Sequence, residues 1–296
     1  MRRIFLKSLH FLLLLAMFSS VSAENWSFQE ALEHSRHLSV TIPTPEPDGR
    51  IQTLNRNGGV APSIDYATKQ FIAFGKNKTV LEVGGAYGLV MSQVLKKYPN
   101  TIYHINDLDK RHLALAANYL LNKKKINQER LENQTRFISG DFMDVILKDS
   151  YDAILISRVL HFMSPIQLSK TIDKLYDTLK PGGRVYVLAI TPYVNRYKHF
   201  IPEYEKRLLA EDPYPGYVSS LYTWLNKSVT SASQQNKISD KPFMFLDDRV
   251  LRRLFSKKSF RILECKTKSM PYYSDSWTLD GRENVILIAE KPANKG

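Results

Sequence analysis

One stretch in the first third of the chain carries residues whose types and spacing suit ligand chemistry. It runs from Thr79 to Met91 as TVLEVGGAYGLVM, an apolar run with a single acid, Glu82, then a turn of small residues, then apolar residues at near-helical spacing. The small residues of the turn are Gly84, Gly85, Ala86 and Gly88. This pattern predicts a buried strand, a tight turn and a helix. Small residues let the backbone adopt positive φ and approach a ligand closely, and the helix N-terminus offers unpaired N–H groups to that ligand.

The glycine spacing separates this turn from the common dinucleotide-binding turn. A G-x-G-x-x-G fingerprint counted from Gly84 would need a third glycine where the chain has Leu89. The chain has G-x-A-x-G instead, with an acid two residues before the first glycine. An ordinary strand–helix connection of an α/β protein could also look like this, so the interpretation depends on the rest of the chain.

The next strand candidate, Thr101 to Asn106, leads into an acid. Asp107 follows it, nineteen residues beyond Gly88, and Leu108 comes next. A carboxylate at the tip of this strand can accept hydrogen bonds from both hydroxyls of a ribose. The alternative role for Asp107 is a simple cap of the following helix.

Two further strand candidates end in polar residues. Arg136 to Ser139 is followed closely by Asp141, which could accept the amino group of adenine, with Phe142 or Met143 beside the ring. Tyr151 to Ser157 is strongly apolar and ends in a hydroxyl. Strands that alternate with helices form parallel sheets, whose ligands lie at the carboxyl ends of the strands. We therefore expect these side chains to meet the glycine turn at one edge of the sheet.

The order and spacing of these segments resemble class I S-adenosylmethionine (SAM) dependent methyltransferases over residues 63–296. The segments that carry the resemblance are Glu82 to Gly88, Asp107, Gly140-Asp141, YDAILISRVLHF from Tyr151, LKPGGRVYVL from Leu179, Asp247 to Phe255 and Glu283 to Lys291. The chain departs from the family pattern at Ala86, which replaces a glycine, and at Ser259, where a glycine is usual before Phe260.

The resemblance implies an α/β, Rossmann-like, doubly wound sheet of seven strands, mostly parallel with the last strand antiparallel, and helices on both faces. It implies SAM as cofactor, S-adenosyl-L-homocysteine (SAH) as product, and no metal. The residues that it implies for cofactor binding are Glu82, Gly84, Gly85, Ala86, Gly88, Asp107, Leu108, Asp141, Phe142 and Ser157.

The N-terminal segment predicts export. Residues 1–23 have a basic start, a short apolar run and V-S-A before a cleavage point after Ala23, which is the design of a signal peptide. The alternative is an uncleaved anchor, although the apolar run is short for a spanning helix. We therefore expect a periplasmic or secreted protein if the source is bacterial, with no stable transmembrane domain. SAM is made inside cells, so its source after export is an open question.

The rest of the chain divides into an N-terminal extension, residues 24–62, and the domain of residues 63–296. Residues 191–245 form an aromatic-rich insertion in that domain. We interpret it as a mostly helical lid over the acceptor, and the alternative is an additional packing layer. The chain has one cysteine, Cys265, which excludes an intramolecular disulfide.

The segment after Ser157 bears on the acceptor. Methyltransferases that act on base amino groups usually carry an N/D-P-P-Y/F motif there, whereas this chain has SRVLHF, as in the small-molecule branch. Alignment and exclusion of water suffice for methyl transfer unless a proton must leave the acceptor, so the catalytic residues stay unknown. His161 is a candidate base with a structural role as the alternative, and Arg158 is a candidate for an anionic substrate group.

The charge pattern limits the partners. The net charge is +13, but the lysines and arginines are dispersed, and nucleic acid would prefer one clustered patch. A small-molecule acceptor is therefore favoured over protein or lipid, and nucleic acid is disfavoured. Two alternatives stay open: an exported binding or effector protein that keeps the fold without turnover, and an aminopropyl transferase, for which the required acids after the fourth strand are missing.

Overall fold

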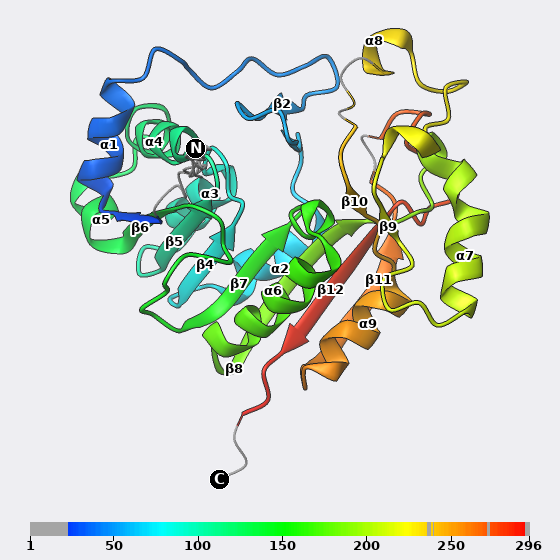
Figure 1. Ribbon diagram of the computed structural model, residues 1–296. Coiled ribbons are helices and arrows are strands. Elements are labelled where there is room, and N and C mark those ends of the chain that lie inside the picture. Colours follow the sequence, from blue (N-terminus) through cyan, green and yellow to red (C-terminus); the bar gives the residue numbers. More distant parts are fainter. Residues whose placement is uncertain (1–22, 236–237, 239, 271–272, 294–296) are drawn as a thin grey trace, which may run out of the picture.

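The computed structural model describes residues 23–235, 238, 240–270 and 273–293, so the predicted signal peptide lies outside the described residues except for Ala23. An eight-stranded sheet forms the centre of the molecule, in the order β1-β6-β5-β4-β7-β8-β12-β11 (Figure 1). Its strands are β1 (Glu24–Trp26), β4 (Thr79–Val83), β5 (Ile102–Asp107), β6 (Thr135–Ser139), β7 (Tyr151–Ser157), β8 (Leu179–Ile190), β11 (Arg261–Lys268) and β12 (Asn284–Glu290).

The strand directions confirm the expected fold class. The strands β6, β5, β4, β7 and β8 are parallel to one another, and β12 lies antiparallel between β8 and β11. The sheet has eight strands where the sequence predicts seven, because the extension adds β1 antiparallel to β6, with Glu24 opposite Ser139. A three-residue strand has too little periodicity to be seen in a sequence.

Helices cover both faces of the sheet, as expected (Figure 1). On one face, Leu81 and Val187 pack with α6 and α9; on the other, Val80 and Tyr103 pack with α2, α3 and α4. The helices are α1 (Phe28–Arg36), α2 (Tyr66–Phe74), α3 (Leu89–Lys97), α4 (Lys110–Asn118), α5 (Gln128–Gln134), α6 (Pro165–Thr178), α7 (Ile201–Leu209), α8 (Ala232–Gln235) and α9 (Asp248–Lys257), with short helical turns at Tyr119–Lys123, Leu160–Phe162, Asn195–Phe200 and Tyr222–Trp224.

Side-chain caps fix the starts of two helices. The helix α2 is capped by Asp65, whose side chain accepts the Thr68 N–H at 2.9 Å. The helix α6 begins at Pro165, because Ser164 and Gln167 form a capping box there. In both cases a capping side chain satisfies free N–H groups at the helix start.

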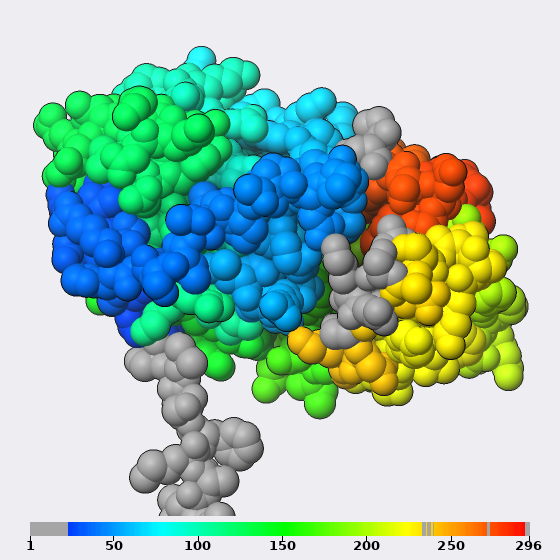
Figure 2. Space-filling model, turned by 90° about the horizontal axis from the view of Figure 1, so that it is seen from above, coloured from blue at the N-terminus to red at the C-terminus, as the bar shows by residue number. Residues whose placement is uncertain are grey.

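The extension and the insertion lie over the carboxyl ends of the parallel strands. The extension contains α1 and a short hairpin, β2 (Ile51–Gln52) with β3 (Gly59–Val60). The insertion contains α7, α8 and the pair β9 (Tyr217–Val218) and β10 (Phe243–Met244). Seen from above, the blue extension crosses this face toward the yellow insertion (Figure 2), and Lys241 Nζ donates to Asn57 Oδ1 at 2.8 Å. The lid role of the insertion stays a prediction, and its aromatics extend the main core.

Candidate functional site

The glycine turn joins β4 to α3 in the way the sequence predicts. Gly84 and Gly88 have φ of +72° and +71°, and Gly88 is the N-cap of α3. The N–H groups of Gly84 and Gly85 both donate to Asn106 O, at 2.8 and 3.1 Å, which ties the turn to β5. A Cβ added at Gly84 would overlap the Val159 side chain. Positive φ and this close contact together require glycine at position 84.

Ala86 takes the same left-handed region without being glycine, at φ +45°. This conformation costs an alanine about 1 kcal/mol. A hydrogen bond offsets the cost, because Ala86 N donates to Asp107 Oδ2 at 2.9 Å. The departure from the family glycine is therefore accommodated by the acid of the next strand.

Among the described acids of the site, Asp107 makes the most side-chain hydrogen bonds. It is 6% exposed, and besides Ala86 N it accepts Asp109 N–H at 2.9 Å and contacts His112 Nδ1 at 3.0 Å through Oδ1. His112 Nε2 accepts the Leu54 N–H at 3.0 Å, so the neutral ring carries its proton on Nδ1 and donates it to Asp107. His112 thereby joins the carboxylate to the extension. The sequence offered no signal for this histidine beyond its place in a helix.

The extension packs directly on the glycine turn. Ala86 and Tyr87 form an apolar cluster with Ile51, Leu54 and other extension residues. Tyr87 Oη also donates to Gln52 O at 2.9 Å. The glycine turn is therefore covered by residues of the N-terminal extension.

Glu82 is buried beneath the turn. Its Oε2 accepts the Tyr103 hydroxyl at 2.7 Å. Burial, opposed by this hydrogen bond and aided by the charge of Asp107, raises the pKa of Glu82 to about 8. The carboxyl is therefore largely protonated at neutral pH in this state of the protein.

The end of β6 provides the next group of candidates. Asp141 Oδ1 accepts Met143 N–H at 2.9 Å, and Phe142 is buried with Lys174 Nζ 5.0 Å from its ring centroid. Ser139, which the sequence analysis did not single out, pairs in register with Asp107, so the two side chains lie on the same side of the sheet. Its buried hydroxyl has no hydrogen-bond partner among the described residues.

The remaining candidates differ in exposure. Leu108 is 56% exposed beside Asp107, and Ser157 lies half-buried at the end of β7. By register, Val83 lies between Asn106 and Ile156, so the ends of β4, β5 and β7 are adjacent. The structure thus brings the predicted residues from four strand ends to one edge, and their binding roles stay predictions.

The two catalytic candidates follow Ser157. Arg158 has φ +58°, and its N–H donates to Leu188 O at 2.7 Å. His161 is 3% exposed and stacks on Phe243 at 4.8 Å between ring centroids. Burial, and then the nearby charge of Arg158, lower the pKa of His161 to about 3. A base this weak attracts a proton poorly at neutral pH, and its role stays a prediction.

Two further features, a metal-binding cluster and a membrane-spanning helix, are considered for the described residues only. No group of three or more His, Cys, Asp or Glu residues within them could hold a metal ion. Within the same part of the chain, no helix combines the length and the apolar character needed to cross a bilayer.

Comparisons with known proteins agree with this geometry. Residues 81–185 match the family described as a methyltransferase domain. O-methyltransferase 4 of Dictyostelium discoideum is 28% identical over 125 residues, which cover 42% of this chain and 33% of that protein. O-methyltransferase 3 of the same organism is 27% identical over 134 residues, 45% of this chain and 30% of that protein. The chain thus spans about a third of the length of the curated relatives it matches.

A solved structure supports the fold over a longer stretch. The SAM-dependent methyltransferase from Methanosarcina mazei has a TM-score of 0.54 and 14% identity, covering 78% of this chain and all of that one. The segment from β4 to the middle of β8 is therefore similar to a methyltransferase domain, and the chain has the Rossmann-like fold of the SAM-dependent methyltransferases.

Proposed function

We propose that this protein transfers a methyl group from SAM to an oxygen atom of a small-molecule acceptor. The observation that carries the proposal is the hydrogen bond from Ala86 N to Asp107. It joins the acid at the end of β5 to the glycine turn at the carboxyl edge of the sheet. The match of residues 81–185 to a methyltransferase domain supports the donor. The O-methyltransferases among the relatives support oxygen as the acceptor atom.

The residues at this edge fit SAM in two respects. The unpartnered hydroxyl of Ser139 lies beside Asp107, where a ligand could complete its hydrogen bonding. Asp107 and Asp141 are acids, which suit a ligand that carries a positive sulfonium and an ammonium, whereas Glu82 is largely protonated. Bound SAM would supply a methyl group activated by the adjacent positive sulfur.

The residues of the chain would bind and orient that group. Asp107 would accept the ribose hydroxyls, Asp141 the adenine amino group, and the small residues of the turn would allow close backbone contact. The apolar surroundings of Val159 and the extension would exclude water from the reacting atoms. The insertion, residues 191–245, would cover the acceptor.

Calorimetric titration of the full-length chain with SAM and SAH tests the proposal. Asp107→Asn should weaken binding at least tenfold, a loss of about 1.4 kcal/mol. Asp109→Asn is the matched control, because asparagine can still cap α4 and the residue lies two positions away. Asparagine is preferred to alanine at position 107, since it leaves an acceptor for some of the buried N–H groups.

The opposite result has a definite meaning. A folded wild-type chain that binds neither SAM nor SAH would favour the second candidate, a binding protein that keeps the fold without turnover. One observation favours that candidate, namely the packing of the extension on Ala86 and Tyr87.

We also propose that residues 1–23 direct export. In support, β1 begins at Glu24, directly after the expected cleavage point, so cleavage would leave the sheet intact. A C-terminally tagged chain should be recovered outside the cytosol with Glu24 as its first residue. Recovery of the uncleaved chain in the cytosol would contradict this.

A further inference from the structure

A second polar site lies at the other end of the same edge, around Arg196 in the 3₁₀ turn Asn195–Phe200. The Arg196 side chain is buried, with the residue 6% exposed. Within the described residues its guanidinium makes one hydrogen bond, from Nη2 to Ser276 Oγ at 3.0 Å, and lies 4.8 Å from the Trp277 ring centroid. Its Nε has no partner among the described residues.

No carboxylate within the described part of the chain forms an ion pair with Arg196. Besides Tyr197, the charged groups that act on it are Arg50 and Asp48, which have opposite signs. Asp48 is already occupied, because its Oδ2 lies 2.7 Å from Arg50 Nε. A buried charge without a counter-charge is unfavourable by several kcal/mol, and sites that keep one commonly use it to bind a ligand of opposite charge.

A second unpaired donor among the described residues lies at the start of β12. Asn284, the first residue of β12, is fully buried and lies opposite Ile190, the last residue of β8. Its Oδ1 accepts the Tyr273 hydroxyl at 2.7 Å, whereas its Nδ2 has no partner in the described structure. Like Arg196 Nε, this donor at the end of β8 favours an acceptor group over a donor group in a ligand.

The position of this site suits an acceptor substrate. The strands β4, β7 and β8 are neighbours, so the glycine turn and the end of β8 are separated by two strand spacings, about 10 Å. The extension contacts the turn, since Ile51 packs on Ala86, and the charge of the adjacent Arg50 acts on Arg196. A small molecule could therefore reach from Arg196 toward a cofactor at the turn.

We propose that Arg196 binds a carboxylate group of the methyl acceptor, which makes the acceptor a small organic acid. The inference rests on the proposed methyltransferase function. One guanidinium matches a single negative charge, whereas a phosphate dianion would leave excess charge in a buried site. The planar fork of arginine matches the geometry of a carboxylate.

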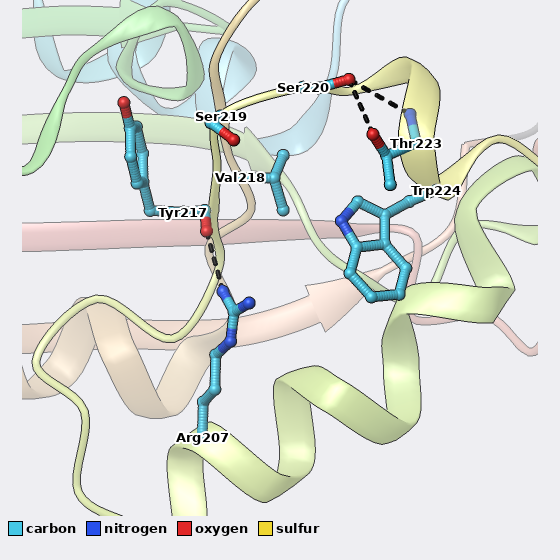
Figure 3. Close-up of a pocket in the computed structure, with 7 residues that line it drawn as sticks. All are labelled: Arg207, Tyr217, Val218, Ser219, Ser220, Thr223 and Trp224. Atoms are coloured by element: carbon cyan, nitrogen blue, oxygen red, sulfur yellow. Dashed lines mark hydrogen bonds between the residues drawn. The ribbon is translucent and has the colours of Figure 1, made fainter.

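A cavity elsewhere in the insertion offers a contrast to the Arg196 site. It has a volume of about 360 Å³ and is lined by Arg207, Tyr217, Val218, Ser219, Ser220, Thr223 and Trp224 (Figure 3). Arg207 is already neutralised there, with Nε 2.7 Å from Glu203 Oε1 and Nη1 donating to Tyr217 O at 2.9 Å. Arg207 therefore serves as the control for Arg196.

The test uses benzoate as a probe carboxylate and benzamide as its uncharged analogue, each titrated into the full-length chain with and without SAH. Benzoate should bind the wild type and Arg207→Met at least tenfold more tightly than benzamide. Arg196→Met should lose at least tenfold in benzoate affinity. If the wild type bound benzoate and benzamide equally well, or did not bind benzoate, the wild-type data alone would overturn the proposal.

Thermal unfolding provides the second measurement. In the absence of anions, Arg196→Met should unfold at the wild-type temperature or above it, because an uncompensated buried charge is removed. Benzoate should raise the unfolding temperature of the wild type and leave that of Arg196→Met unchanged. A variant that unfolds well below the wild type, with no benzoate effect on either protein, would assign Arg196 a structural role and overturn the inference.

Different results would contradict the proposed methyltransferase function and the inference about Arg196. Loss of SAH binding with benzoate selectivity retained would contradict the methyltransferase function and leave an anion site. SAH binding with no preference for benzoate would contradict only the inference about Arg196.

Discussion

The buried carboxyl of Glu82 makes a testable contribution to stability. Its pKa rises from 4.5 to about 8 in the folded protein, mainly through burial. Glu82→Gln replaces it with a neutral side chain of the same shape that can still accept the Tyr103 hydroxyl. The variant therefore removes the titration and retains the packing.

The sign and size of the effect follow from proton linkage. Between pH 4.5 and about 8 the folded protein holds a proton on Glu82 that the unfolded chain has released, so the wild type loses stability as the pH rises. The free energy of unfolding of Glu82→Gln, relative to wild type, should grow by about 1.4 kcal/mol per pH unit over this window. The difference should approach about 5 kcal/mol near pH 8 and then level off.

Urea unfolding of both proteins at several pH values from 4 to 9 measures this difference, and other titrating groups cancel because they are common to both. Glu129→Gln, an exposed glutamate of α5, is the control and should show no such trend. If wild type and Glu82→Gln gave parallel profiles, Glu82 would be ionised in the folded state, and the explanation by burial would be wrong.

Three further predictions concern the turn, the extension and the histidine after β7. Gly84→Ala should lower the free energy of unfolding by about 2–4 kcal/mol, because the added Cβ meets Val159 at positive φ. Adding Val159→Ala should recover part of that loss, and no recovery would contradict the steric cause. His112→Phe removes two buried hydrogen bonds, one of them to Leu54, so it should cost about 2–4 kcal/mol and expose the extension to protease; unchanged cleavage would refute the contact. His161→Phe should gain stability relative to wild type as the pH falls from 6.5 toward 3, because the folded wild type resists protonation that the unfolded chain accepts; parallel acid unfolding curves would contradict this.

The sequence predicts the elements of the sheet because each is specified locally. Apolar runs such as the one at Tyr151 mark buried parallel strands, and Gly84 and Gly88 mark a turn that only small residues can form. The strand count differed by one because β1 is three residues long and exists through its pairing with β6. Pairing of that kind is a tertiary effect, which local patterns do not encode.

The candidate site likewise combines residues that the sequence predicts with contacts that only the folded structure reveals. Asp107 is visible in the sequence as an acid at a strand end, but its partners are not. His112 and Leu54 lie on a helix and on the extension, and they reach the carboxylate only after the chain has folded. The unpaired state of Arg196 is likewise invisible in sequence, because it depends on which carboxylates are absent from its surroundings.

Opposite charges lie toward the two ends of the carboxyl edge of the sheet, although the chain as a whole is strongly basic. Asp107 and Asp141 lie at or just after the ends of β5 and β6, while Arg158 and Arg196 follow β7 and β8. Under the proposed function, a cationic donor at the acidic end and an anionic acceptor at the basic end would each meet an opposite charge. The same arrangement would oppose binding in the reversed orientation, because it would bring like charges together at both ends. Selectivity of this kind depends on where a few charges lie at one edge, which the net charge of +13 does not reveal.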